Sequence, residues 1–489
     1  MDLKLFFCIL VSAAGTAAVA CTGFYVGRKV SADGTTIIAR TVDSKPATCK
    51  RFEILPHVEN VPGRHYLGNN TTTEWPLPAT TYKAVVVPSV PWGLKAGRYD
   101  GACANEKGVM LSGTVTAYAN DAAKKADPYV PSGFAEASLP GLLISCSATA
   151  REAVVLLGRV VGSRGHNGAD RDEAWYVEVY TGHQWAAVRM PENRMLAIGN
   201  QFLLREFDPA SADTLSSPEL VSLPEREGFL KRGERGFIDL AATYAAEPTG
   251  DSALRTWMLR KRFAPDTLSG AYDPKNRLPL FFVPNRKVTL REIQETMRWR
   301  YEGTELCPEE GGDKDKVRVV GVGRQSTCHA LVLDAALPAD RRCTMWVSLS
   351  NAEHAPFLPL NPAIVELAEG YDAAEMHTGD RFCKAIPAAH YRRLGALAEL
   401  DRRLYGDGVR AFWRAREDRW MEEFPAVVRT GDAAAITAYA VKVQRTALGD
   451  AKRIFDELSW YLVKMNFNRG DYGNPNRIPE RKPFVPSAD

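Results

Sequence analysis

Short hydrophobic runs separated by turn residues fill most of the first 350 positions and predict β-strands. Two of these runs, at 24–30 and 35–40, flank Ser31-Ala32-Asp33-Gly34, a sequence typical of a hairpin turn. Residues 58–82 are rich in Pro, Gly and Asn and predict a loop. Further strands are expected at 83–89, 108–116, 174–180, 184–190, 194–200, 331–334 and 344–350.

Helical patterns are fewer and concentrate near the end of the chain. Thr149 and Thr289 each stand three residues before a glutamate, a capping box that predicts a helix start, and the first of these helices should reach Val161. From about residue 385 the pattern is almost wholly helical, and the tail after Asn468 predicts a surface arm. Strands and helices do not alternate strictly, so we expect a layered α+β core with a helical region after it.

The first twenty residues have the pattern of an export signal. Lys4 precedes an apolar run, 5–20, that ends in Ala18-Val19-Ala20, a site of the type that signal peptidase accepts. The run is shorter than the roughly 20 residues that a spanning helix needs. We therefore predict a cleaved signal peptide over 1–20 and an exported protein, periplasmic or secreted. No later apolar run is long enough to predict a transmembrane segment in the mature chain.

Cleavage at this site would make Cys21 the first residue of the mature chain. One interpretation is lipidation, as in bacterial lipoproteins, although Ala18 stands where the lipoprotein signal usually has leucine. The other is an N-terminal nucleophile. Diacylglycerol on the sulfur and an acyl group on the amine would remove nucleophile and base together, so the two interpretations exclude each other at this residue.

Composition excludes several other functions. The chain is 45% hydrophobic and 25% charged, and 62 Lys+Arg against 59 Asp+Glu give a formal net charge of +3. This balance does not favour nucleic acid as a partner. The sequence contains no P-loop, no G-x-G-x-x-G after a strand, no H-E-x-x-H and no C-x-x-C, so neither a cofactor nor a metal is expected. Nine cysteines are too few for a disulfide scaffold at 489 residues, and their pairing stays open, as does a homo-oligomer.

A cysteine at the start of a mature chain combines a nucleophile with a base, because an α-amine has an ordinary pKa of about 8. Its thiolate then needs a nearby cation, and its ammonium needs an anion. Arg40 and Asp43 supply one charge of each sign, on a strand predicted to return beside the first through the hairpin turn. An exposed ion pair is the ordinary alternative for such a pair.

Five segments, in the same order, resemble one family. The first runs from Cys21-Thr22-Gly23 to Arg40-Thr41-Val42-Asp43. The others are N-E-x-G-V at 105–109, W-Y-x-E-x-x-x-G-H-x-W within 173–185, an asparagine segment at 198–202 and R-x-W within 254–257. Together they resemble the dipeptidase branch of the N-terminal-nucleophile hydrolases (peptidase family C69), which is related to penicillin V acylases and bile-salt hydrolases.

The resemblance implies a role for each matching residue. Cys21 would be the nucleophile and its amine the base, Asp43 would hold the amine, and Arg40 would favour the thiolate. Asn200 would donate to the oxyanion, and Arg255 would match an arginine of the wider superfamily's site. Val115 stands where the acylases carry a second asparagine, which leaves the second oxyanion donor open and favours the dipeptidase branch.

Three of these residues also have ordinary structural interpretations. Asn200 could end a strand as a turn residue, and Asn105 could form a turn before a strand. Arg255 could be a helix-surface cation paired with Asp251, and Arg260 is a second arginine that could take its place in the site.

The resemblance implies a four-layer αββα sandwich with a C-terminal helical extension. We expect a signal peptide at 1–20, a catalytic domain at 21–380 and a helical region at 381–489 packed on the core. The expected function is a cysteine-type dipeptidase acting on dipeptides or short peptides through an acyl-enzyme on Cys21. An acylase for N-acyl amides of the penicillin V or bile-salt type, and a non-catalytic peptide-binding lipoprotein anchored at Cys21, are the alternatives.

Overall fold

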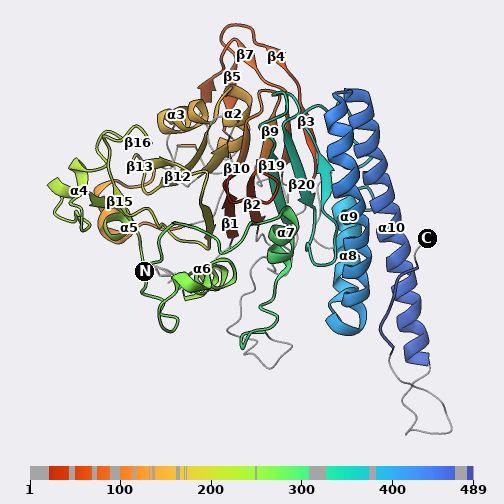
Figure 1. Ribbon diagram of the computed structural model, residues 1–489. Coiled ribbons are helices and arrows are strands. Elements are labelled where there is room, and N and C mark those ends of the chain that lie inside the picture. The colour runs from red at the N-terminus through yellow and green to blue at the C-terminus, as the bar shows by residue number, and fades with distance from the viewer. Residues whose placement is uncertain are drawn as a thin grey trace, which may run out of the picture.

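The computed structural model combines two antiparallel β-sheets with helices (Figure 1). It describes residues 21–42, 50–68, 74–88, 100–113, 117–130, 133–134, 138–160, 166–169, 171, 173–247, 250–307, 327–373, 382–467 and 482–487.

The first sheet has seven antiparallel strands, and the start of the described chain lies near its centre. In spatial order the strands are β18 (Phe281–Phe282), β14 (Met195–Ile198), β1 (Cys21–Val26), β2 (Thr36–Val42), β19 (Thr327–Leu333), β20 (Cys343–Ser348) and β21 (Leu358–Leu360). β1 pairs with β2 so that Cys21 faces Val42 and Gly23 faces Arg40. Its other edge pairs with β14, where Gly23 faces Ile198.

The predicted hairpin between the first two strands is confirmed, and its turn is stabilised by Asp33. One carboxylate oxygen of Asp33 accepts hydrogen bonds from the Ser31 hydroxyl, the Thr35 hydroxyl and the Thr35 backbone N–H. Gly34 follows with a φ of 78°, a left-handed conformation that glycine adopts without strain. The strand ends at Val26, earlier than residue 30 as predicted, because residues 27–35 form a longer connection.

The second sheet has eight antiparallel strands. In order they are β16 (Thr214–Ser216), β13 (Trp185–Arg189), β12 (Ala174–Val179), β11 (His166–Ala169), β10 (Met110–Gly113), β9 (Asp100–Asn105), β8 (Ala84–Pro88) and β3 (Glu53–Leu55). Strand β2 of the first sheet contacts β10 and β11, and β20 contacts β9. Because the central strands of both sheets are buried, the space between the sheets is filled by side chains.

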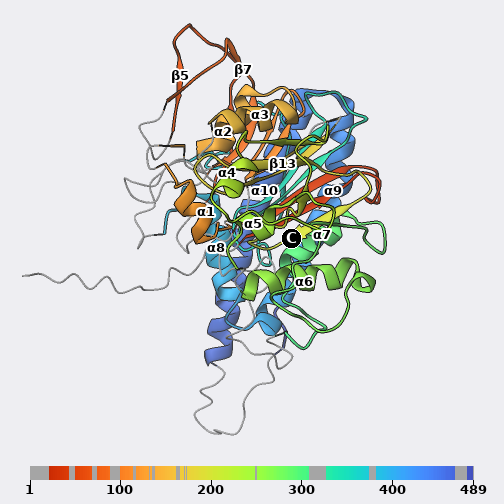
Figure 2. The same cartoon turned by 90° about the vertical axis from the view of Figure 1, so that its left-hand side faces the viewer.

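Helices pack on both sheets. α2 (Leu139–Cys146) and α3 (Ala150–Val160) cover the eight-stranded sheet through contacts with β9, β10, β11 and β12. α6 (Gly250–Phe263) contacts β14, and α7 (Leu290–Arg298) contacts β2 and β19. Figure 2 shows α2 and α3 at one end of the view and α6 and α7 towards the other. The capping box at Thr289 is confirmed, with hydrogen bonds in both directions between Thr289 and Glu292.

The helical region predicted from residue 385 is also confirmed. α8 (Pro387–Ala398), the π-helical turn η4 (Arg402–Gly406), α9 (Asp407–Thr430) and α10 (Ala433–Phe467) follow one another, and α9 and α10 contact the edge strand β21 (Figure 1). Of the predicted surface arm, residues 482–487 are described, and Phe484 is buried there against Tyr461. The predicted boundary at 380/381 falls outside the described residues and stays a prediction.

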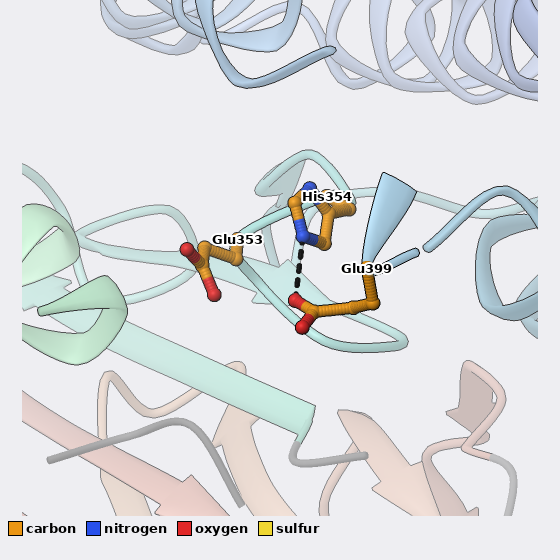
Figure 3. A group of neighbouring side chains, drawn as sticks. All are labelled: Glu353, His354 and Glu399. Carbon is orange, nitrogen blue, oxygen red and sulfur yellow. Dashed lines mark hydrogen bonds and ion pairs between the residues drawn. The ribbon is translucent and has the colours of Figure 1, made fainter. Parts of the chain in front are cut away.

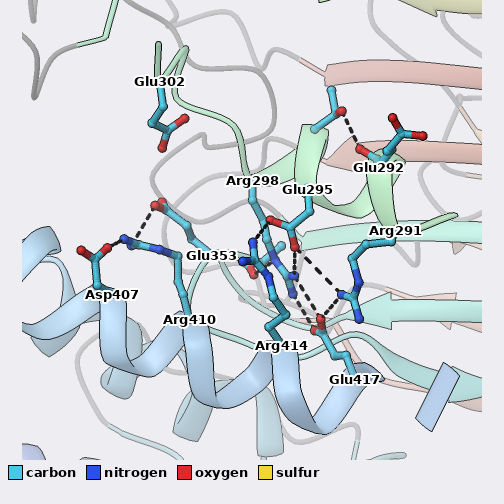
Figure 4. A network of polar contacts seen from close by, with 12 residues as sticks. Arg291, Glu292, Glu295, Arg298, Glu302, Glu353, Asp407, Arg410, Arg414 and Glu417 are labelled. Carbon is cyan, nitrogen blue, oxygen red and sulfur yellow. Dashed lines mark hydrogen bonds and ion pairs between the residues drawn. The ribbon is translucent and has the colours of Figure 1, made fainter. Parts of the chain in front are cut away.

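A buried ion-pair network joins α7 to α9 (Figure 4). The Glu417 carboxylate on α9 accepts from the Arg298 guanidinium at 2.5 and 3.0 Å and from Arg291 at 2.8 Å, and both arginines belong to α7. It also accepts from the backbone N–H of Phe357 at 2.8 Å, next to β21. Glu417 and Arg298 are almost fully buried, so these contacts connect the C-terminal helices to the sheet.

The remaining elements correct one expectation. The predicted loop at 58–82 contains short strands, because its backbone pairs with itself and Tyr66 donates a hydrogen bond to Ser138. These are β4 (Val58–Glu59), β5 (His65–Leu67), β6 (Glu74–Pro76) and β7 (Thr80–Thr81).

Elements without a clear sequence signal are α1 (Asp121–Ala126), β15 (Glu206–Phe207), α4 (Ser222–Arg226), β17 (Ile238–Asp239), α5 (Leu240–Tyr244) and η2 (Pro265–Thr267). None of the helices in the described part of the chain has the length and apolar character that crossing a bilayer requires.

Candidate active site

The thiol of Cys21 lies at the first position of β1 and is only 3% exposed. Val42, its cross-strand partner on β2, is two residues from Arg40, so Arg40 and Cys21 are diagonal neighbours on one face of the sheet. An Arg40 guanidinium nitrogen, Nη2, lies 3.3 Å from Cys21 Sγ, and Arg40 is 2% exposed. The Arg40 guanidinium therefore faces the sulfur directly.

The backbone nitrogen of Cys21 faces a side chain that is far away in the sequence. Cys21 N–H donates to Oδ1 of Asn200 at 2.9 Å. Asn200 follows the end of β14, the strand that pairs with β1 on the side opposite β2, and this pairing brings the two residues together. Asn200 is therefore more than a turn residue at the end of a strand, because it contacts the predicted nucleophile directly.

Arg255 completes this group from α6. Its Nη2 donates to Asn200 Oδ1 at 2.7 Å, and its Nη1 donates to Thr22 Oγ1 at 2.9 Å and to the Cys21 carbonyl oxygen. Because the Cys21 N–H and the Arg255 guanidinium are both donors, the Asn200 side-chain atom that faces them is its carbonyl oxygen and not its amide nitrogen.

Burial decides between the alternatives for the two arginines of α6. Arg255 is 1% exposed, so its interpretation as a helix-surface cation is wrong. Arg260 donates to the Pro279 carbonyl at 2.5 Å and lies over the Phe282 ring, 4.1 Å from its centroid. The structure thus brings Arg255, and not Arg260, to Cys21.

Two further titratable side chains, Lys50 and His329, lie near Arg40 and were not predicted as site residues. Burial and the neighbouring Arg40 charge lower the pKa of Lys50 to about 7, and its Nζ is close to Gly101 on β9. His329 pairs with Arg40 across β2 and β19, and bonds Ser112 Oγ at 2.8 Å on the other sheet. Burial, with Arg40 and Lys50, holds the pKa of His329 well below its usual range, so His329 is neutral. Strand β19 begins at Thr327, earlier than the predicted start at 331.

Two predicted positions lie outside the described residues: Asp43, the proposed partner of the amine, and Val115, at the second oxyanion position. A third position, Asn105, is described and is fully buried. Its Oδ1 accepts from the N–H groups of Lys107 and Val109, and its Nδ2 donates to Ile144 and Ser147. Asn105 therefore closes the turn between β9 and β10, which is its ordinary structural interpretation.

One group of side chains in the described residues has the spacing of a metal site, namely Glu353, His354 and Glu399 (Figure 3). His354 Nε2 bonds Glu399 at 2.7 Å. Glu353, however, is held by arginines: its carboxylate lies 2.6 Å from Arg300 and 3.1 Å from Arg410, and Arg402 bonds it as well. Because three guanidinium groups already neutralise it, Glu353 does not fit a cation ligand.

Comparisons with known proteins identify the family. The family model described as Peptidase family C69 matches residues 20–384. A protein named probable dipeptidase B from Streptococcus pyogenes serotype M1 is 27% identical over 472 residues, covering 91% of this chain and 92% of its own. A probable dipeptidase from Salmonella dublin is 31% identical, covering 65% of this chain and 76% of its own.

Among solved structures, a penicillin V acylase from Agrobacterium tumefaciens matches 70% of this chain and 86% of its own. The identity is 13% and the TM-score is 0.32, so this similarity is too low to support the assignment.

The family match begins one residue before Cys21 and includes Arg40, Asn200 and Arg255, the residues that meet around the thiol. The chain therefore belongs to peptidase family C69.

Proposed function

We propose that the protein is an exported cysteine dipeptidase whose nucleophile is Cys21, exposed as the N-terminal residue when residues 1–20 are removed. The convergence of Arg40, Asn200 and Arg255 on the sulfur, nitrogen and carbonyl oxygen of this one residue is the observation that carries the proposal. An ordinary strand residue has no need of two buried arginines and an asparagine around it. The names of the relatives, probable dipeptidases, support the substrate class.

In the proposed reaction the Cys21 sulfur attacks the carbonyl carbon of the dipeptide bond. The free α-amine accepts the thiol proton and returns it to the leaving amine, so the acyl group stays on sulfur. Water then attacks the thioester, with the same amine as base, and releases the first amino acid. Arg40 faces the sulfur that carries the negative charge after this proton transfer, since its guanidinium lies 3.3 Å away.

Asn200 and Arg255 hold the amine in position for this proton transfer. The Asn200 carbonyl oxygen accepts from the Cys21 nitrogen, and Arg255 fixes both Asn200 and the Cys21 carbonyl oxygen. Asn200 is also proposed to donate its amide N–H to the oxyanion, as the family resemblance implies, and one preorganised donor of this kind contributes about 3 kcal/mol. Asp43 is proposed to balance the charge of the ammonium form.

We also propose the four-layer αββα arrangement for the catalytic region. It is supported by contacts of β2 with β10 and β11 between the sheets, by α2 and α3 on the eight-stranded sheet, and by α6 and α7 on the seven-stranded sheet. In this arrangement the site lies at the ends of the central strands of the first sheet.

The experiment is a dipeptide panel assayed with the wild type, Cys21→Ala and Cys146→Ala, each with its N-terminus checked by intact mass. Cys21→Ala should lose at least about 10³-fold in kcat/KM, because nucleophile removal leaves only residual catalysis. Cys146→Ala should keep wild-type activity, since this half-buried thiol ends α2. The folded state of each variant is checked by its thermal unfolding.

Three outcomes would contradict the proposal. They are full activity in Cys21→Ala, mature-rate turnover by a chain that still carries residues 1–20, and a lipid adduct on Cys21 of the native protein. Hydrolysis of penicillin V or a conjugated bile acid in preference to every dipeptide would move the substrate to N-acyl amides.

A further inference from the structure

Glu178 is a buried carboxylate opposite the segment that carries Asn200. It lies on β12 of the eight-stranded sheet and is 1% exposed. Its Oε1 accepts from the backbone N–H of Leu203 at 2.7 Å and of Leu204 at 3.2 Å. The segment 199–204 continues from β14 of the seven-stranded sheet, so this one side chain joins the two sheets next to the site.

The segment 199–204 needs such a partner, because it has no regular secondary structure and Leu203 and Leu204 are nonetheless buried. Buried backbone N–H groups without an acceptor are costly and rare. At the start of the segment, Gly199 N–H donates to Thr256 Oγ1 at 3.0 Å on α6. At its end, Glu178 accepts the two N–H groups, and Asn200 lies between these two attachments.

Two tyrosine hydroxyls also donate hydrogen bonds to the Glu178 carboxylate. The Tyr176 hydroxyl donates to Oε1 at 2.9 Å and the Tyr180 hydroxyl to Oε2 at 2.8 Å. Burial raises the pKa of Glu178 to about 7, against the effect of these donors. Hydrogen bonds to the charged form favour it, so two hydroxyls and two backbone N–H groups form a site shaped for a carboxylate.

We propose that Glu178 is a positioning residue for the reaction, which holds the segment 199–204 so that Asn200 meets the Cys21 nitrogen. This rests on the proposed function, in which that contact orients the base. Glu178 is not a catalytic residue, since its bonds go to the segment and to two tyrosines and not to Cys21.

The test compares Glu178→Gln with the wild type in dipeptide hydrolysis and in amide hydrogen exchange. Glutamine has nearly the same volume as glutamate, but an NH₂ group replaces one of the two oxygens. That NH₂ group would face N–H and O–H groups that are themselves donors, so hydrogen bonds to the segment would be lost. Because the contact acts on the base and not on substrate binding, kcat should fall at least about tenfold while KM changes by less than about threefold. Exchange in 199–205 should become faster, while exchange in the other described strands stays unchanged.

Two control variants show whether the effect comes from the bonds of Glu178 to the segment 199–204 or from any change near β12. Glu173→Gln, just before β12 and 3.8 Å from Arg189, should leave kcat and exchange unchanged. Tyr176→Phe removes one donor but leaves the bonds to Leu203 and Leu204, so its kcat should stay within about threefold of the wild type. Wild-type kcat in Glu178→Gln, unchanged exchange in 199–205, or faster exchange throughout the protein would each overturn the proposal. If the wild type hydrolyses no dipeptide, the proposed function fails, and the exchange comparison alone decides whether Glu178 holds the segment.

Discussion

At the scale of single residues, Lys50 is the most unusual charge near Cys21. It is 2% exposed and has Arg40 as a cationic neighbour, so its ammonium form is disfavoured, although Asp100 and Cys21 oppose this effect. The pKa is about 7 in the folded state and about 10.5 in a model peptide. Between these values the unfolded chain binds the proton and the folded chain does not. The contribution of Lys50 to stability therefore rises as the pH increases from about 7 to about 10.5.

Lys50→Met tests this dependence. The free energy of unfolding of the wild type, measured by urea titration at several pH values, should rise relative to the variant between pH 7 and 10, because methionine has no proton to lose. Lys29→Met is the control, since the Lys29 side chain is 65% exposed on the surface. A constant difference between wild type and Lys50→Met across this range would show that Lys50 keeps its ordinary pKa.

At the scale of elements, the close approach of β14 to α6 positions Asn200. Gly199 lies at the end of β14, and a Cβ atom there would come within 2.6 Å of the Ser252 carbonyl oxygen on α6. The neighbouring Gln201 side chain donates to that same oxygen at 2.9 Å. The strand and the helix can therefore carry Asn200 and Arg255 at bonding distance only because residue 199 has no side chain.

Gly199→Ala should push the strand end away from α6. We expect a loss of about 1–3 kcal/mol in the free energy of unfolding, as for other overpacked sites. The dipeptidase kcat should fall as well, because the Asn200 contact with Cys21 lengthens. Gly449→Ala is the matched control: no atom lies within 4 Å of its Cβ position on α10, and it should stabilise the protein by about 0.5–1 kcal/mol. Equal stabilities of the two variants would refute the close-approach explanation.

Elements with local signals could be predicted from the sequence. The hairpin at 31–34 and the capping box at Thr289 have their turn and cap residues in the correct order, and both are confirmed. Residues 58–82 were wrongly predicted as a loop, because their short strands depend on pairing with each other and on contacts such as Tyr66 with Ser138. Local composition does not contain that information.

The site also contains residues that local sequence could predict and residues that it could not. Cys21 and Arg40 could be related from the sequence, since one hairpin joins them. Asn200 and Arg255 could be named only through the family resemblance, because their contact with Cys21 depends on the pairing of β1 with β14 and the packing of α6. Glu178 and His329 were missed as members of a site, since their partners lie across the space between the sheets. Lys50 was missed because its lowered pKa depends mainly on burial, which local sequence does not show.

At the scale of the whole molecule, the network around Glu417 connects the C-terminal helices to the rest of the fold. Glu417→Gln should lower the free energy of unfolding by about 3–5 kcal/mol, because Arg298 would keep a buried charge without its counter-ion. Unfolding in urea measures this loss. Glu422→Gln, on the same helix but outside the network, is the control. A loss below about 1 kcal/mol would show that Arg298 is compensated by its other partner, Glu295.

The central position of β1 also has a consequence for how the chain folds. The neighbours of β1 and β2 on either side are β14 and β19, and Cys21 meets an asparagine 179 residues further along. During synthesis the first hairpin leaves the ribosome with both of its outer edges unsatisfied, and β2 gains its second partner only when residues 327–333 have been made. Contacts this distant in sequence slow folding and expose strand edges to other chains. We therefore expect the newly made polypeptide to depend on protection from aggregation until the last third of its length is available.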